Sequence, residues 1–149
     1  MREILFRGKS ANNGEWVYGD LVQLHDGRRY IINNRHGACI DDKGNFLNTE
    51  APFVCEVDPE TVGQFTVLID KNGKKIFEGD ILKFQINIHT FILGKITFLC
   101  GAFVFESTEL DRECDLAFVT FADDEIALPK DCIEVIGNIH DNPELMEGA

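Results

Sequence analysis

The clearest pattern along the chain is a strict alternation of apolar and polar residues. Every even-numbered residue from Leu82 to Ile88 is apolar, and every odd-numbered residue from Lys83 to His89 is polar. Successive side chains of a β-strand point to opposite faces of the sheet, so this segment predicts a strand with one buried face and one solvated face. His89 ends the polar face and is therefore expected to be exposed to solvent rather than to bind a metal.

Turn residues between short apolar runs predict β-hairpins elsewhere in the chain. Runs at 66–69 and 75–77 flank a segment that contains Asn72-Gly73, whose positive φ angles suit a hairpin turn. A second predicted hairpin pairs 21–24 with 29–32 around 25–28. Further strands are predicted at 94–99, 102–105, 116–121 and 133–139, with a turn at Cys100-Gly101.

One helical signature stands near the C-terminus. Asn142 can cap a helix and Pro143 can take its first position, ahead of residues 144–147. A weak internal repeat is also visible, because 16–24 resembles 76–84 with a central Gly-Asp in each. Both copies predict a strand, a Gly-Asp turn and a second strand, although turn chemistry alone selects these two residues.

Many short strands separated by turns predict an all-β protein. We expect residues 62–139 to form a small, strongly bent SH3-like barrel, because about five short strands closed by turns would bury the many Phe and Ile side chains. Residues 1–61 would supply N-terminal β-hairpins, and region 62–149 would hold the barrel and the short C-terminal helix. The two regions are expected to be either separate or one integrated domain.

The charge is acidic and unevenly distributed. The formal net charge is −12, and residues 76–149 hold 4 basic and 15 acidic residues, against 10 and 11 in residues 1–75. This balance disfavours nucleic acid and anionic membranes as partners. Nucleic-acid binding through a small basic cluster, Arg28, Arg29 and Arg35, is therefore the least favoured function. With no apolar run near the ~20 residues of a membrane span, and with Arg7 interrupting any signal-peptide core, a cytoplasmic location in a bacterial host is predicted.

Residues that would carry catalysis or bind a cofactor show no characteristic spacing. The four histidines lack metal-binding frames, no Gly-x-Ser-x-Gly elbow occurs, and the 13 glycines are scattered among turns. The five cysteines contain no Cys-x-x-Cys pair and are expected to be reduced thiols. We therefore expect no catalytic residue, no cofactor and no metal, and predict that the protein is not an enzyme.

Carboxylates are concentrated in one segment of the second half. Glu106 opens it, and eight carboxylates fall within about twenty residues, opposed only by Arg112. Their spacing does not match a calcium loop. They serve either to keep two loops soluble or to face a basic partner protein. The candidate partner-binding residues are Glu109, Asp111, Glu113, Asp115, Asp123, Asp124 and Glu125.

Three blocks of the sequence resemble the YopX family, whose members come chiefly from bacteriophages and prophages. They are residues 1–9 with 16–21, residues 60–81 with Asp70-Lys71-Asn72-Gly73 and Glu78-Gly79-Asp80, and residues 135–145 with Gly137-Asn138-Ile139-His140-Asp141-Asn142-Pro143. The resemblance implies a fold but no assigned activity. Val67 stands where family members more often have Gly, which predicts a more regular strand here.

Two functions from different classes follow. The leading hypothesis is a non-enzymatic phage accessory protein whose acidic loops, 106–115 and 123–125, face a basic host or phage protein. The alternative is a small hydrolase or nucleotide-handling enzyme with a site assembled from Asp20, Asp80 and His140. The Phe content also allows an apolar patch for self-association, so a homo-oligomer is a further expectation.

Overall fold

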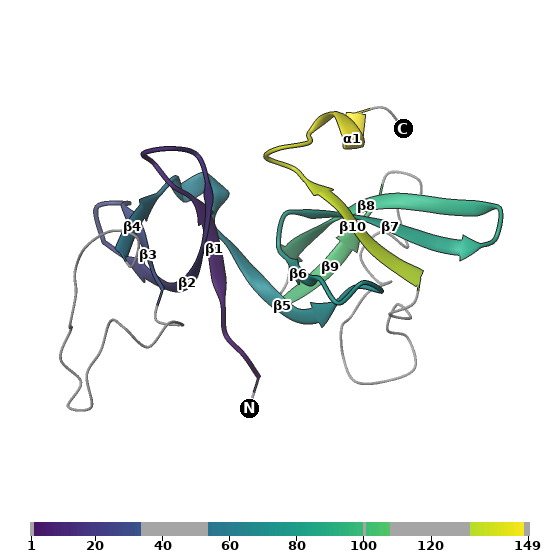
Figure 1. The fold of residues 1–149 in the computed structure, drawn as a ribbon, viewed down its shortest axis with the longest axis horizontal. Coiled ribbons are helices and arrows are strands. Elements are labelled where there is room, and N and C mark those ends of the chain that lie inside the picture. The colour runs from purple at the N-terminus through teal and green to yellow at the C-terminus, as the bar shows by residue number, and fades with distance from the viewer. Residues whose placement is uncertain (1, 34–53, 100, 108–131, 148–149) are drawn as a thin grey trace. The chain divides into compact units, whose positions relative to one another are not determined.

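The computed structural model describes residues 2–33, 54–99, 101–107 and 132–147 (Figure 1). The chain divides into two compact units, residues 1–65 and 66–149. Strands dominate both units, and the helices among the described residues are one 3₁₀ turn, η1 (Pro59–Thr61), and one α-helical turn, α1 (Glu144–Glu147). No helix in this part of the chain is long and apolar enough to cross a membrane.

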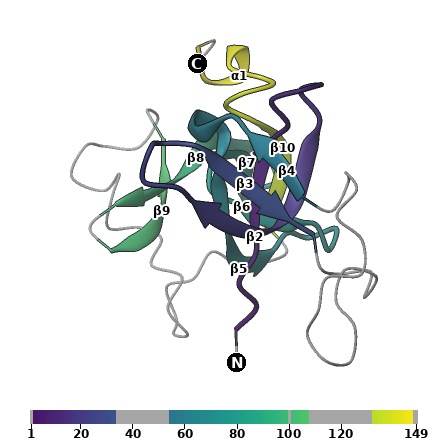
Figure 2. The same cartoon turned by 90° about the vertical axis from the view of Figure 1, so that its left-hand side faces the viewer.

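The first unit is a curled antiparallel sheet, seen from its β2 and β3 side in Figure 2. A bridge between Ser10 and Val57 brings the strand Val54–Val57 beside the end of the strand Phe6–Lys9. Asp58 N–H also donates to Lys9 O at 2.9 Å. Leu5, Ile31 and Val57 are buried. Its strands, in the order β4-β3-β2-β1-β5, are β1 (Phe6–Lys9), β2 (Trp16–Gln23), β3 (Arg29–Ile32), β4 (Val54–Val57) and the beginning of β5 (Gly63–Ile69).

Gly19 lies inside continuous strand β2 rather than in a turn, so the predicted Gly-Asp turn at 19–20 is wrong. A Cβ at Gly19 would lie 2.1 Å from the carbonyl oxygen of Ile32 on β3, which requires glycine here for close backbone approach. The matching Gly79 does lie in a turn, with φ +90. The two halves of the sequence repeat therefore have different structures and different reasons for their glycine.

The second unit contains a four-stranded antiparallel sheet in the order β10-β7-β8-β9. The predicted hairpins at 66–77 and 94–105 are confirmed. Ile76, Leu82, Ile92, Ile96, Phe105 and Ile133 form its buried core. The strands of this unit, besides the end of β5, are β6 (Lys75–Phe77), β7 (Asp80–Asn87), β8 (Thr90–Leu99), β9 (Ala102–Glu106) and β10 (Ile133–Asn138).

The all-β prediction is confirmed, but no closed barrel is formed by the strands that the structure describes. Closing a barrel requires the two edge strands of a sheet to pair with each other, whereas β10 and β9 are the edges of the four-stranded sheet and are not hydrogen-bonded neighbours. The SH3-like barrel predicted for 62–139 is thus not found in these strands. The strand predicted at 116–121 lies outside the described residues.

The alternating segment 82–89 forms most of β7 but does not bury every apolar side chain. Leu82 is fully buried, whereas Ile88 is 87% exposed at the tip of the β7–β8 hairpin, beyond the end of the strand. Alternation predicts the face of a side chain and not whether a second layer covers that face. His89 is exposed, as predicted.

Val67 breaks the regularity of β5, which contradicts the prediction of a more regular strand. Its φ is +77, a left-handed conformation that is a true outlier for a β-branched residue. The Thr66 hydroxyl holds the bend by donating to Ile76 O at 2.8 Å and accepting from Leu68 N–H at 3.3 Å. The chain therefore keeps a backbone that suits glycine, and Val67 bears the strain.

Asp70 joins the β5–β6 hairpin to β10. Its Oδ1 accepts from the backbone N–H groups of Asn72 at 2.8 Å and Lys74 at 2.9 Å, and its Oδ2 accepts from Val135 N–H at 3.0 Å. Gly73 supplies the positive φ of this turn, at +81, while Asn72 keeps a negative φ. The carboxylate thus replaces a tight Asn-Gly turn and fixes a contact between residues 65 apart in sequence.

Candidate functional site

The C-terminal segment is fastened to the sheet where β10 ends. Asp80 pairs with Asn138 in the β7–β10 register, and Ile139 N–H donates to Gly79 O at 2.9 Å. Gly79 N–H in turn donates to Ile96 O on β8 at 2.8 Å, so the turn at Gly79 is hydrogen-bonded both to β8 and to the segment that follows β10. Buried Asp80 stabilises that turn, because its Oδ2 accepts from Phe77 N–H at 2.7 Å.

Asn138 organises the turn that leads into α1. Its Oδ1 accepts from the N–H groups of His140 at 3.0 Å and Asp141 at 2.9 Å. Asn142, predicted to cap the helix, instead turns its Oδ1 back toward Asn138 N–H at 3.3 Å and covers Gly137, where a Cβ would lie 2.6 Å from that oxygen. Residues 137–143, which carry part of the family resemblance, therefore build a hydrogen-bonded turn.

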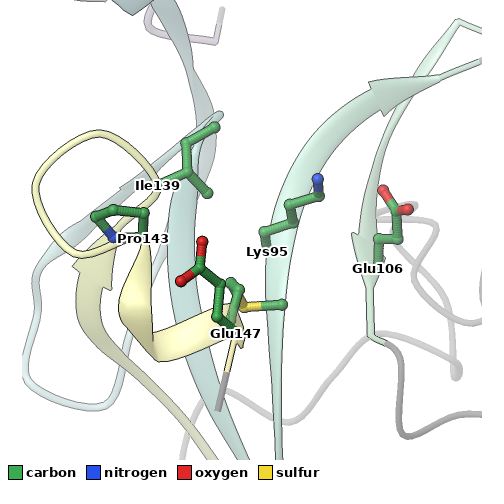
Figure 3. A pocket seen from close by; sticks show the side chains of 6 residues that line it. Lys95, Glu106, Ile139, Pro143 and Glu147 are labelled. Atoms are coloured by element: carbon green, nitrogen blue, oxygen red, sulfur yellow. The ribbon is translucent and has the colours of Figure 1, made fainter. Parts of the chain in front are cut away.

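This turn places α1 beside the β8–β9 hairpin, and a cleft of about 310 Å³ lies between them (Figure 3). Figure 3 shows Ile139 and Pro143 on the terminal segment, Glu147 on α1, and Lys95 and Glu106 projecting from neighbouring strands. The cleft is lined by Lys95, Glu106, Ile139, Pro143, Met146 and Glu147.

The cleft combines an apolar floor with three charges that have no partner in the described part of the chain. Lys95 and Glu106 are register partners on β8 and β9 and are both half-buried, yet neither side chain forms an ion pair or hydrogen bond there. Glu147 on α1 is exposed and likewise forms no ion pair or hydrogen bond with another described residue. The local charge is thus −1, held beside the apolar atoms of Ile139 and Met146.

A second cleft, of about 360 Å³, lies in the first unit, but its charges are already engaged. Asp26 and Arg28 form an exposed ion pair at 2.8 Å, and Asp58 accepts from Glu60 N–H at 3.0 Å. The backbone N–H and then the guanidinium of Arg28 hold the pKa of Asp26 below its ordinary value. These groups stabilise turns, so the cleft beside α1 is the stronger candidate site.

The candidate partner-binding residues, Glu109, Asp111, Glu113, Asp115, Asp123, Asp124 and Glu125, lie outside the described residues. Glu106, which opens the acidic segment, is described and lines the cleft. No feature of the sequence singles out Lys95, Ile139 or Met146, because the cleft depends on where α1 comes to lie. Sequence reasoning therefore found one of the six lining residues.

The residues of the predicted enzyme site occupy different settings. Asp20 is exposed on β2 in the first unit, whereas Asp80 is buried in the second and accepts from a backbone N–H. His140 is half-buried in the Asn138 turn. Among the described residues no group of three or more His, Cys, Asp or Glu could hold a metal, and Cys55 and Cys132 are free thiols.

Comparison with known proteins agrees with this fold. A family model described as YopX protein matches residues 5–147. The crystal structure of protein EF1440 from Enterococcus faecalis is 24% identical, with a TM-score of 0.51, and the match covers 98% of this chain and 99% of that one. No curated protein matches the chain. The family model thus covers the turns at 79–80 and 137–143. The chain belongs to the YopX family.

Proposed function

We propose that this protein is a non-enzymatic accessory protein of a phage or prophage that acts by binding a basic protein partner. The observation that carries the proposal is the cleft beside α1, where Glu106 and Glu147 form no ion pair with another described residue and Glu106 stands at the start of the acidic segment. Its charged groups face an opening rather than the hydrogen-bonded interior, and an apolar floor adds contact area. This combination is typical of a surface that binds another protein.

The charge of the second half supports a basic partner. Residues 76–149 carry 15 acidic and 4 basic residues, so the field around the cleft attracts positively charged proteins and speeds their association. Such an attraction depends on ionic strength, because the Debye length falls from about 10 Å at 0.1 M salt to about 3 Å at 1 M. Binding should therefore be strong at low salt and lost at high salt.

The test is a capture of proteins from bacterial host lysate at about 0.1 M and about 1 M salt. The native protein is compared with an acidic-loop variant in which five carboxylates become amides: Glu109, Asp111, Glu113, Asp123 and Asp124. A control variant with the same net charge carries amides in place of Glu3, Glu15, Asp41, Asp42 and Glu60. Any captured protein is then purified and its binding measured directly.

We expect a basic protein that the native chain and the control variant retain at low salt and release at high salt. The acidic-loop variant should lose it. The control separates the position of the carboxylates from the net charge, which is the same in both variants. Recovery of the same partners by all three proteins, or of none, would refute the proposal and direct attention to enzyme assays.

A further inference from the structure

The cleft beside α1 is small for a ligand pocket and has room for one side chain. Its volume of about 310 Å³ is at the lower end of the range for ligand pockets, about 300–1,000 Å³. It lies between α1 and the β8–β9 hairpin of the second unit (Figure 3), and among the described residues it is a partly open cleft rather than an enclosed cavity. Its occupant should therefore be a group that projects from a larger molecule.

The apolar floor selects an occupant with an aliphatic stem. Ile139 and Pro143 on the terminal segment and Met146 on α1 line one side of the cleft. A thioether is polarizable and adapts to irregular shapes, which favours contact with methylene groups or with a flat, delocalised cation. Long basic side chains lay such stems along apolar surfaces while their charged ends stay near carboxylates.

The charges select a single positive group on that stem. Glu106 and Glu147 outnumber Lys95, so an occupant with one positive charge would neutralise the cleft. The two carboxylates come from different elements, β9 and α1. A guanidinium has five N–H donors in a planar fork and can address two separate carboxylates, whereas an ammonium is compact and strongly hydrated.

We propose that the cleft beside α1 is a socket for one arginine side chain of the basic partner. This inference rests on the proposed function and deepens it. The arginine stem packs against Ile139 and Met146, and its guanidinium donates to Glu106 and Glu147. Lys95 opposes the cation, which limits the affinity of a lone arginine and leaves specificity to the surrounding acidic surface.

The test uses N-acetyl-arginine amide as the probe and the full chain labelled with ¹³C at the methionine methyl groups. The sequence contains two methionines, Met1 and Met146, so the spectrum holds one signal from the cleft and one internal control. The citrulline analogue is the matched probe, because it keeps the shape of arginine without the charge. N-acetyl-lysine amide and the glutamate analogue complete the series.

We expect a saturable shift of the Met146 methyl with the arginine probe and no change at Met1. The dissociation constant should be millimolar or weaker, as suits one side chain. Glu147→Gln and Glu106→Gln should each weaken binding about two- to fivefold, the range for one exposed charge pair, and Lys95→Met should strengthen it by a similar factor. Glu60→Gln, in the first unit, should change nothing.

Equal binding of the citrulline analogue, preference for the glutamate analogue, or weaker arginine binding by Lys95→Met would each overturn the socket. Capture of the partner by the Glu106→Gln/Glu147→Gln variant separates this proposal from the previous one. If the double variant retains the partner fully while the acidic-loop variant loses it, the proposed function stands and the arginine socket fails. If the acidic loops make no difference, the proposed function itself fails.

Discussion

Replacing Asp70 by Asn should destabilise the second unit strongly, although the two side chains have nearly the same shape. The Asp70 carboxylate is 1% exposed and accepts three backbone N–H groups, the third from Val135 on β10. An amide offers one oxygen and one NH₂ group. If its oxygen keeps the bonds to Asn72 and Lys74, its NH₂ faces the Val135 N–H, and two donors oppose each other.

The magnitude follows from that one lost bond. A hydrogen bond to a charged group contributes about 1.5–3 kcal/mol to stability, and leaving a buried donor unsatisfied costs about 1–3 kcal/mol. These figures describe the same loss from two sides and are not added. We therefore expect Asp70→Asn to lower the free energy of unfolding by about 2–3 kcal/mol at pH 7, a large fraction of the stability of a small domain.

The effect should vanish in acid. Burial of the carboxylate raises the pKa of Asp70, but the N–H donors of Val135, Lys74 and Asn72, with the nearby charge of Lys74, outweigh it and leave the pKa below its ordinary value. Between the folded and unfolded pKa values the unfolded chain binds more protons, so stability rises with pH there. The contribution of Asp70 is complete above pH ~4–5 and is lost as the pH falls through the folded pKa.

The assay must report on the second unit. Trp16, Tyr18 and Tyr30 are all in the first unit and are the only tryptophan and tyrosines of the chain, so their fluorescence does not serve. Urea unfolding followed by hydrogen exchange of peptides from β7 and β8 is the suitable measurement, at pH 7 and in steps down to pH 3.

Asp26→Asn provides the matched control, because Asp26 also accepts backbone and side-chain donors in a turn but is exposed to solvent. It should change stability far less than Asp70→Asn. Equal effects of the two substitutions, or an Asp70→Asn deficit that persists unchanged at pH 3, would refute the assignment of Asp70 as a buried, charged link between the hairpin and β10.

Two substitutions test the backbone of the strands. In urea unfolding, Val67→Gly should stabilise the chain by about 0.5–1 kcal/mol, because relief of the left-handed strain exceeds the entropy cost of glycine. The control is Val22→Gly, at a comparably exposed strand residue with ordinary φ, which should destabilise the chain by about the same amount. Gly19→Ala should cost about 3 kcal/mol or more through the clash with Ile32 O, seen as earlier unfolding by Trp16 fluorescence; wild-type stability would contradict the close approach of β2 and β3.

Local chemistry determined most of the strands and turns. Alternation at 82–89 and the turn residues of 25–28 and 70–74 act over a few neighbouring residues, so β7 and the two hairpins could be predicted from the sequence. These predictions succeeded because the relevant partners are close in sequence.

Contacts between distant residues required the tertiary structure. Asp70 reads as a turn residue, and its bond to Val135 depends on how β10 lies along β7. Val67 reads as an ideal strand residue, yet its neighbours hold it in a left-handed conformation. Lys95 and Met146 line the same cleft although they are far apart in sequence. A sequence pattern records the preference of each residue for its surroundings, whereas only packing decides which distant residues become those surroundings.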